Sequence, residues 1–103
     1  MAPSFVRHVR SFGRVELECR GVVDAGTVTA LRRELAGFEA AAFRQLTVDL
    51  RLVTALDAAG VAALASTAVA LRRRGVEIRL LAPQDRRAGR ILDYSGLVPV
   101  LAA

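Results

Sequence analysis

The chain has 103 residues, a length that supports one domain with one hydrophobic core. Its hydrophobic fraction of 53% and charged fraction of 24% are typical of a globular protein and argue against disorder. The net charge is +5, and all 15 basic residues are arginine. Guanidinium groups favour acidic partners. The lack of lysine and asparagine also fits the codon usage of a GC-rich genome, so both explanations stay open.

No segment of the sequence predicts export or membrane insertion. The uncharged run at residues 60–71 is shorter than the ~20 apolar residues that a membrane helix needs. Arg7, His8 and Arg10 occupy positions where a signal peptide would be apolar. The single cysteine, Cys19, cannot form an internal disulfide and suits a reducing compartment. We therefore expect a cytoplasmic protein that is not embedded in a membrane.

The N-terminal part of the chain has the period of two that is typical of strands. Residues 14–20 alternate strictly, which predicts a half-exposed strand. Its apolar face consists of Val15, Leu17 and Cys19. A weaker alternation over residues 5–9 predicts an earlier strand, joined to the first by a turn at residues 11–13.

The pattern changes to helical spacing after Asp24. A first helix is predicted by four apolar residues, Val28, Leu31, Leu35 and Phe38. Asp24 or Thr27 can accept the free N–H groups at its start. A strand is predicted at residues 46–50, followed by a connection over residues 52–56.

The second half of the sequence repeats this alternation of helix and strand. A helix is predicted over residues 60–74, ended by Gly75, with a buried stripe of Val61, Leu64, Ala65, Ala68 and Leu71. A strand at residues 76–81 and a helix at residues 85–95 follow. Gly96 ends that helix, and residues 97–101 close against the core.

Strands separated by helices require crossover connections, which imply a largely parallel sheet. The N-terminal hairpin makes the sheet mixed. We therefore predict one α/β domain over residues 1–103, with its core at about 5–101. The sheet should have four to five strands, accompanied by three to four helices.

Few residues of this chain could carry enzyme chemistry. A glycine-rich phosphate loop is missing from the sequence, and His8 and Cys19 are its only nitrogen and sulfur metal ligands. No acid, base and nucleophile can be placed together. We therefore expect no catalytic site, metal or cofactor. Asp49 interrupts an apolar run, and we interpret it as an edge or cross-strand partner for an arginine.

Asp24 and Asp57 are different, because each follows a predicted strand and precedes a predicted helix. The carboxyl ends of parallel strands meet at the ligand-binding edge of open α/β sheets. Each aspartate is therefore either a helix cap or part of a recognition edge. Their positions alone leave the two interpretations equal.

Five short motifs occur in the order and spacing of one known family. They are Gly21-Val22-Val23-Asp24, Val48-Asp49-Leu50, Asp57-Ala58-Ala59-Gly60-Val61, Ala82-Pro83 and Ser95-Gly96-Leu97. Together they resemble the STAS domains of anti-sigma factor antagonists, over about residues 5–101. Two departures stand out. The family's glutamate before Asp24 is missing, and the phosphorylatable Ser or Thr of the central motif is replaced by Ala58 and Ala59.

The resemblance implies a non-enzymatic regulatory domain that binds an anti-sigma factor or GHKL-type kinase. It implies a partner-binding set of Asp24, Thr27, Asp57, Ala58, Ala59, Gly60 and Val61. Without a hydroxyl in the motif, the usual phosphorylation cannot switch the domain off. Alternatives are a STAS subunit of a lipid-trafficking transporter, a stressosome-like scaffold or a small-ligand sensor. Nucleic-acid binding is disfavoured, since no aromatic platform accompanies the arginines, and a homodimer is left open.

Overall fold

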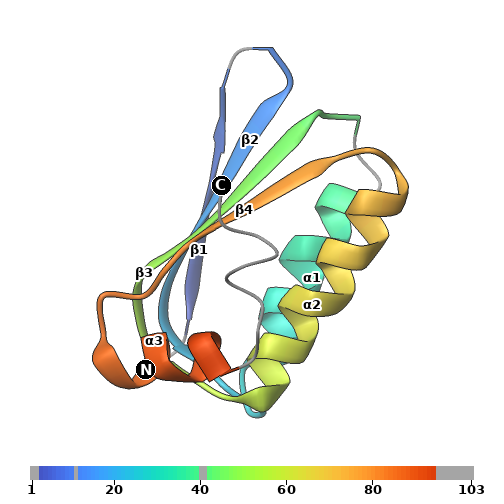
Figure 1. Ribbon diagram of the computed structural model, residues 1–103. Helices are drawn as coiled ribbons and strands as arrows, with labels where there is room; N and C mark the ends of the chain where they lie inside the picture. The colour runs from blue at the N-terminus through green and yellow to red at the C-terminus, as the bar shows by residue number, and fades with distance from the viewer. Residues whose placement is uncertain (1–2, 11, 40–41, 95–103) are drawn as a thin grey trace.

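The computed structural model describes residues 3–10, 12–39 and 42–94. Within these residues the chain forms, in order, β1 (Ser4–Val9), β2 (Arg14–Val23), α1 (Val28–Glu39), β3 (Gln45–Leu56), α2 (Ala58–Arg73), β4 (Glu77–Leu81) and α3 (Arg86–Tyr94). The strands make one sheet in the order β1-β2-β3-β4, with β1 antiparallel and the others parallel (Figure 1). The predicted single α/β domain with a mixed sheet is therefore confirmed.

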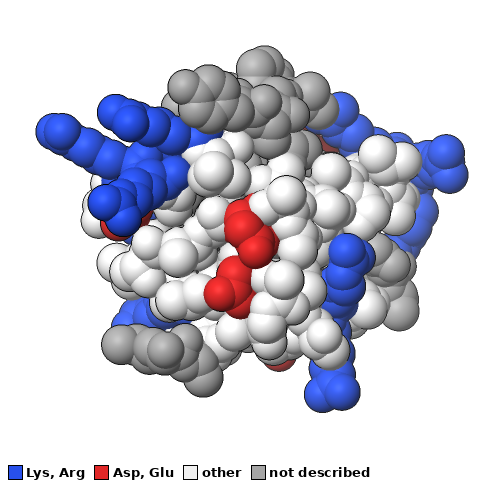
Figure 2. All heavy atoms as spheres, turned by 90° about the horizontal axis from the view of Figure 1, so that it is seen from below, with Lys and Arg blue, Asp and Glu red and all other residues white. Residues whose placement is uncertain are grey.

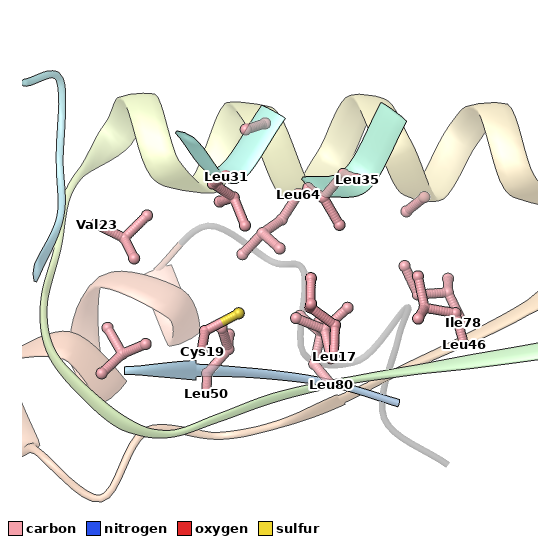
Figure 3. Packing of buried hydrophobic residues seen from close by; sticks show 14 of the residues in the cluster. Leu17, Cys19, Val23, Leu31, Leu35, Leu46, Leu50, Leu64, Ile78 and Leu80 are labelled. Carbon is pink, nitrogen blue, oxygen red and sulfur yellow. The ribbon is translucent and has the colours of Figure 1, made fainter. Parts of the chain in front are cut away.

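Helices α1 and α2 cover one face of the sheet, and the hydrophobic core fills the space between the layers (Figure 3). Leu31 and Leu35 of α1 and Leu64 of α2 point toward the strands. The strands contribute buried side chains of their own, among them Leu17, Cys19, Leu46, Leu50, Ile78 and Leu80. This apolar burial is the main stabilising contribution to the fold.

Strand β3 is longer than the sequence predicts. The expected connection at residues 52–56 is part of the strand, which runs without interruption to Leu56. Strand pairing with β2 shifts register between Glu18 and Arg20 and again between Gly21 and Val22, so that β3 carries extra residues there. These irregularities break the alternation of buried side chains, and a pattern search based on period two therefore misses the strand.

The buried stripe of α2 also differs from the prediction. The helix begins at Ala58, and Ala63 and Thr67 are buried in it while Val61 and Ala65 are only partly buried. Leu64, Ala68 and Leu71 are buried, as predicted. Gly60 is buried as well, in contact range of β2 and β3, and this contact fixes the rotation of the helix on the sheet.

The predicted stop of α2 is confirmed. Gly75 has a φ of +76°, the left-handed conformation that glycine adopts at low cost, and its N–H bonds the Arg72 carbonyl at 2.9 Å. The predicted stop at Gly96 and the closing segment at residues 97–101 lie outside the described residues.

Asp49 has an arginine partner, but on its own strand. Its carboxylate accepts from Arg51 Nε at 3.0 Å and Nη2 at 2.9 Å. The side-chain hydrogen bond from Arg51 lowers the pKa of Asp49, although burial of the carboxylate opposes the shift. The prediction of an edge or cross-strand pair was wrong, because β3 is an interior strand and the partner lies two residues along it.

Candidate partner-binding site

The junctions from β2 to α1 and from β3 to α2 lie at the same edge of the sheet. β2 and β3 are parallel, and Val23 pairs with Leu56 at their carboxyl ends. The Asp57 N–H donates to the Val23 carbonyl at 3.3 Å, and the Ala25 N–H donates to Asp57 Oδ2 at 2.9 Å. The structure therefore brings the segments around Asp24 and Asp57 into direct contact.

The Asp57 carboxylate caps helix α2. Its Oδ1 accepts a hydrogen bond from the Gly60 N–H at 3.1 Å, and its backbone is extended, as is typical of an N-cap residue. Hydrogen bonds from backbone N–H groups lower the pKa of Asp57, the one from Gly60 most, against an opposing effect of burial. Asp57 is therefore a carboxylate at neutral pH, with both oxygens held by the backbone.

Asp24 and Thr27 form a tight turn in front of helix α1. Asp24 Oδ1 accepts from the N–H groups of Gly26 at 2.9 Å and Thr27 at 3.1 Å. The Thr27 hydroxyl accepts from the Asp24 N–H at 3.0 Å and donates to the Val22 carbonyl at 2.8 Å. These bonds precede the helix, which begins at Val28, so the two side chains order the loop beside Asp57.

The remaining predicted residues differ in accessibility. Ala58 is exposed at the first position of α2, and Ala59 and Val61 are partly exposed. Gly60 is buried, and a Cβ there would lie 2.8 Å from Leu56 Cδ1 and 2.9 Å from Val23 Cγ1. Gly60 therefore acts by allowing α2 to approach the strands, and Ala58 is the side chain that this turn presents to solvent.

Charge is distributed unevenly over this end of the molecule. Both Asp24 and Asp57 follow strands that terminate there (Figure 1). Figure 2 shows two acidic groups side by side among uncharged atoms, with arginine side chains toward the margins. Such a surface has an acidic centre, an uncharged surround and a basic rim, features that suit a protein partner.

Two groups in this site were missed by sequence reasoning, the Ala25 N–H and the Val23 carbonyl. Both are backbone groups, so no side-chain pattern in the sequence could have indicated them. In the part of the chain that the structure describes, no helix is long and apolar enough to cross a membrane. The same residues contain no cluster of three or more His, Cys, Asp and Glu side chains that could hold a metal ion.

The fold and this edge define a class of small α/β regulatory domains. The family model of the STAS domain matches residues 6–101, and the chain belongs to that family. The structure is similar to an anti-sigma factor antagonist from Mycobacterium paratuberculosis, with a TM-score of 0.86 and 20% identity over 97% of this chain and 83% of the other.

Two further solved structures share the fold. The anti-sigma factor antagonist SpoIIAA in its unphosphorylated form has a TM-score of 0.77 and 17% identity, over 95% of this chain and 85% of that one. A STAS-domain antisigma-factor antagonist from Rhodobacter sphaeroides has a TM-score of 0.66 and 20% identity, over 78% and 86%. At these identities the likeness establishes the fold.

Proposed function

We propose that this STAS domain is a non-enzymatic regulator of transcription that acts as an anti-sigma factor antagonist in the bacterial cytoplasm. Its partner would be an anti-sigma factor of the GHKL kinase type. The partner-binding surface would consist of Asp24, Thr27 and residues 57–61. The observation that carries this proposal is the exposed methyl group of Ala58 next to the carboxylate of Asp57, at the start of α2.

The position of Ala58 explains what a phosphate would do and what its absence means. A phosphorylated side chain there would add about −1.5 to −2 charges to a surface that already contains Asp57. The free N–H groups at the start of α2 would stabilise that charge within the domain, while a partner shaped for the unmodified surface would be repelled. Alanine accepts no phosphate, so binding would be insensitive to this modification.

The nearby hydroxyl groups are poor substitutes for the missing one. The Ser66 hydroxyl donates to the Ala62 carbonyl inside α2, and Thr67 is buried. Thr54 is exposed, but it precedes the cap residue and lies on strand β3. None of these residues occupies the first turn of α2, where a phosphate would meet both Asp57 and the partner.

The experiment compares wild type with the Ala58→Ser variant, using a purified GHKL-type anti-sigma factor kinase from the same organism. Calorimetry should show binding by both proteins without ATP. After incubation with ATP, intact mass should rise by one phosphate in Ala58→Ser alone, and only that variant should lose affinity, by at least tenfold. A stoichiometric phosphate on residues 54–67 of wild type would contradict the missing switch.

Two charge-introducing variants test the surface itself. Ala58→Arg adds a bulky cation to the exposed centre without touching the Asp57 cap and should weaken kinase binding at least tenfold. Val69→Arg is the matched control, because Val69 is exposed on the same helix two to three turns away. Equal affinities for the two variants would remove this edge as the binding surface. Recovery of the native protein in a membrane ATPase complex would instead favour a transporter subunit.

A further inference from the structure

The end of the sheet opposite the partner-binding surface contains an open depression of about 210 Å³. It is lined by Phe12, Arg14, Arg44, Gln45 and Glu77. Arg14, Gln45 and Glu77 are register partners at the starts of β2, β3 and β4, so their side chains stand next to one another. The depression is therefore built on three neighbouring parallel strands, away from Asp24 and Asp57.

Backbone hydrogen bonds hold the β1–β2 turn against the start of β3. The Gly13 carbonyl accepts from the N–H groups of Arg44 at 2.8 Å and Gln45 at 3.2 Å. The Arg44 carbonyl in turn accepts from the Glu77 N–H at 3.0 Å. A Cβ at Gly13 would lie 3.0 Å from Arg44 Cγ, so the turn and the arginine are closely packed. The walls of the depression are fixed in advance of any ligand.

Phe12 is an unusual residue at this rim. Its φ is +62°, a left-handed conformation that costs a residue other than glycine about 1–3 kcal/mol, and its ring is 83% exposed. Neither local conformation nor burial in this domain favours an aromatic residue there. A strained backbone and an exposed ring beside a preformed depression together point to a contact made with another molecule.

The charges around the depression leave two cations available. Within the described residues, neither the Arg14 nor the Arg44 guanidinium forms a hydrogen bond or an ion pair. Glu77 is already engaged, since it accepts from Gln45 Nε2 at 3.1 Å and from Arg79 Nε at 3.0 Å. The lining thus offers two free guanidinium forks, which match carboxylate and phosphate groups.

We propose that this depression binds a small anion that carries a planar ring. The ring would stack on Phe12, and its carboxylate or phosphate would accept hydrogen bonds from Arg14 and Arg44. The volume is below the ~300–1,000 Å³ of sites for drug-sized ligands, which limits the ligand to about one ring and its anionic group. Such a site would give the domain an input separate from the partner-binding surface.

The test is a ¹⁵N–¹H NMR titration of the full chain with phenyl phosphate, benzoate and inorganic phosphate. Phenyl phosphate should give saturable shifts at the Gly13, Arg14 and Gln45 amides in the millimolar range, and benzoate should shift the same amides. Arg44→Gln should weaken both at least tenfold. Phe12→Gly should weaken phenyl phosphate at least fivefold and leave inorganic phosphate unchanged.

Arg73→Gln is the matched control, because Arg73 is an exposed arginine in the last turn of α2 and does not line the depression. The same spectra report whether each variant is folded, and Arg14→Gln replaces Arg44→Gln if the latter is not. Non-saturable shifts, or equal weakening by Arg73→Gln and Arg44→Gln, would overturn the proposal and indicate unspecific attraction to arginine.

Discussion

The Asp57 carboxylate joins the two strand-to-helix junctions, because its Oδ2 accepts a hydrogen bond from the Ala25 N–H at 2.9 Å. Its Oδ1 simultaneously accepts from the Gly60 N–H and caps α2. One side chain therefore fixes the position of the α1 turn relative to the start of α2. The interpretations as a cap and as part of a recognition edge are compatible, because the cap determines the shape of the edge.

Replacing Asp57 with alanine should destabilise the domain by about 2 kcal/mol. Loss of an N-cap costs about 1 kcal/mol, and the Ala25 N–H loses its partner as well. Asp85→Ala is the matched control, because Asp85 bonds only the Arg87 and Ala88 N–H groups at the start of α3. It should cost about 1 kcal/mol. Urea unfolding measures both, and equal losses would contradict a bridging role for Asp57.

The contribution of Asp57 to stability should depend on pH. Hydrogen bonds from Gly60 and other backbone N–H groups lower its pKa in the folded state below the ordinary value of 3.8. The stabilisation is therefore fully present above that value and is lost as pH falls through the lower folded-state pKa. The difference in unfolding free energy between wild type and Asp57→Ala should shrink between pH 5 and about pH 2. A difference that stays constant over this range would contradict the prediction.

Gly60→Ala should destabilise the domain by about 1–2 kcal/mol, although alanine is the better helix former. The new Cβ would lie 2.8 Å from Leu56 Cδ1 and 3.0 Å from the Val23 carbonyl oxygen, so α2 must shift. Gly89→Ala in α3 provides the control, since its Cβ would meet only the Pro83 carbonyl oxygen at 3.6 Å. That variant should gain about 0.5–1 kcal/mol. Thermal or urea unfolding should therefore give opposite signs.

Cys19 should be nearly inert in the folded protein. Burial, followed by the charge of Asp49, raises the pKa of its thiol to about 12, so almost no thiolate exists at pH 8. Modification by DTNB at pH 8 should be roughly 1,000-fold slower in the native state than in 6 M guanidinium chloride. Similar rates in the two states would show that the thiol is accessible.

Most of the fold could be predicted because its signals are local. Alternation over residues 14–20 and helical spacing from Val28 to Phe38 reflect the geometry of single elements, and both elements are present. The end of β3 was missed because its register shifts arise from pairing with β2. The rotation of α2 was missed for a similar reason, since the close contact of Gly60 with Val23 and Leu56 decides it.

By itself the sequence determined the order of the elements, the family and the missing hydroxyl at Ala58, because these follow from side-chain identity and spacing along the chain. Only the tertiary structure decided that Asp57 bonds the Ala25 N–H and that Phe12 stands beside Arg14 and Arg44. These relationships join segments far apart in the sequence. They depend on strand register and backbone groups, which leave no pattern in the order of side chains.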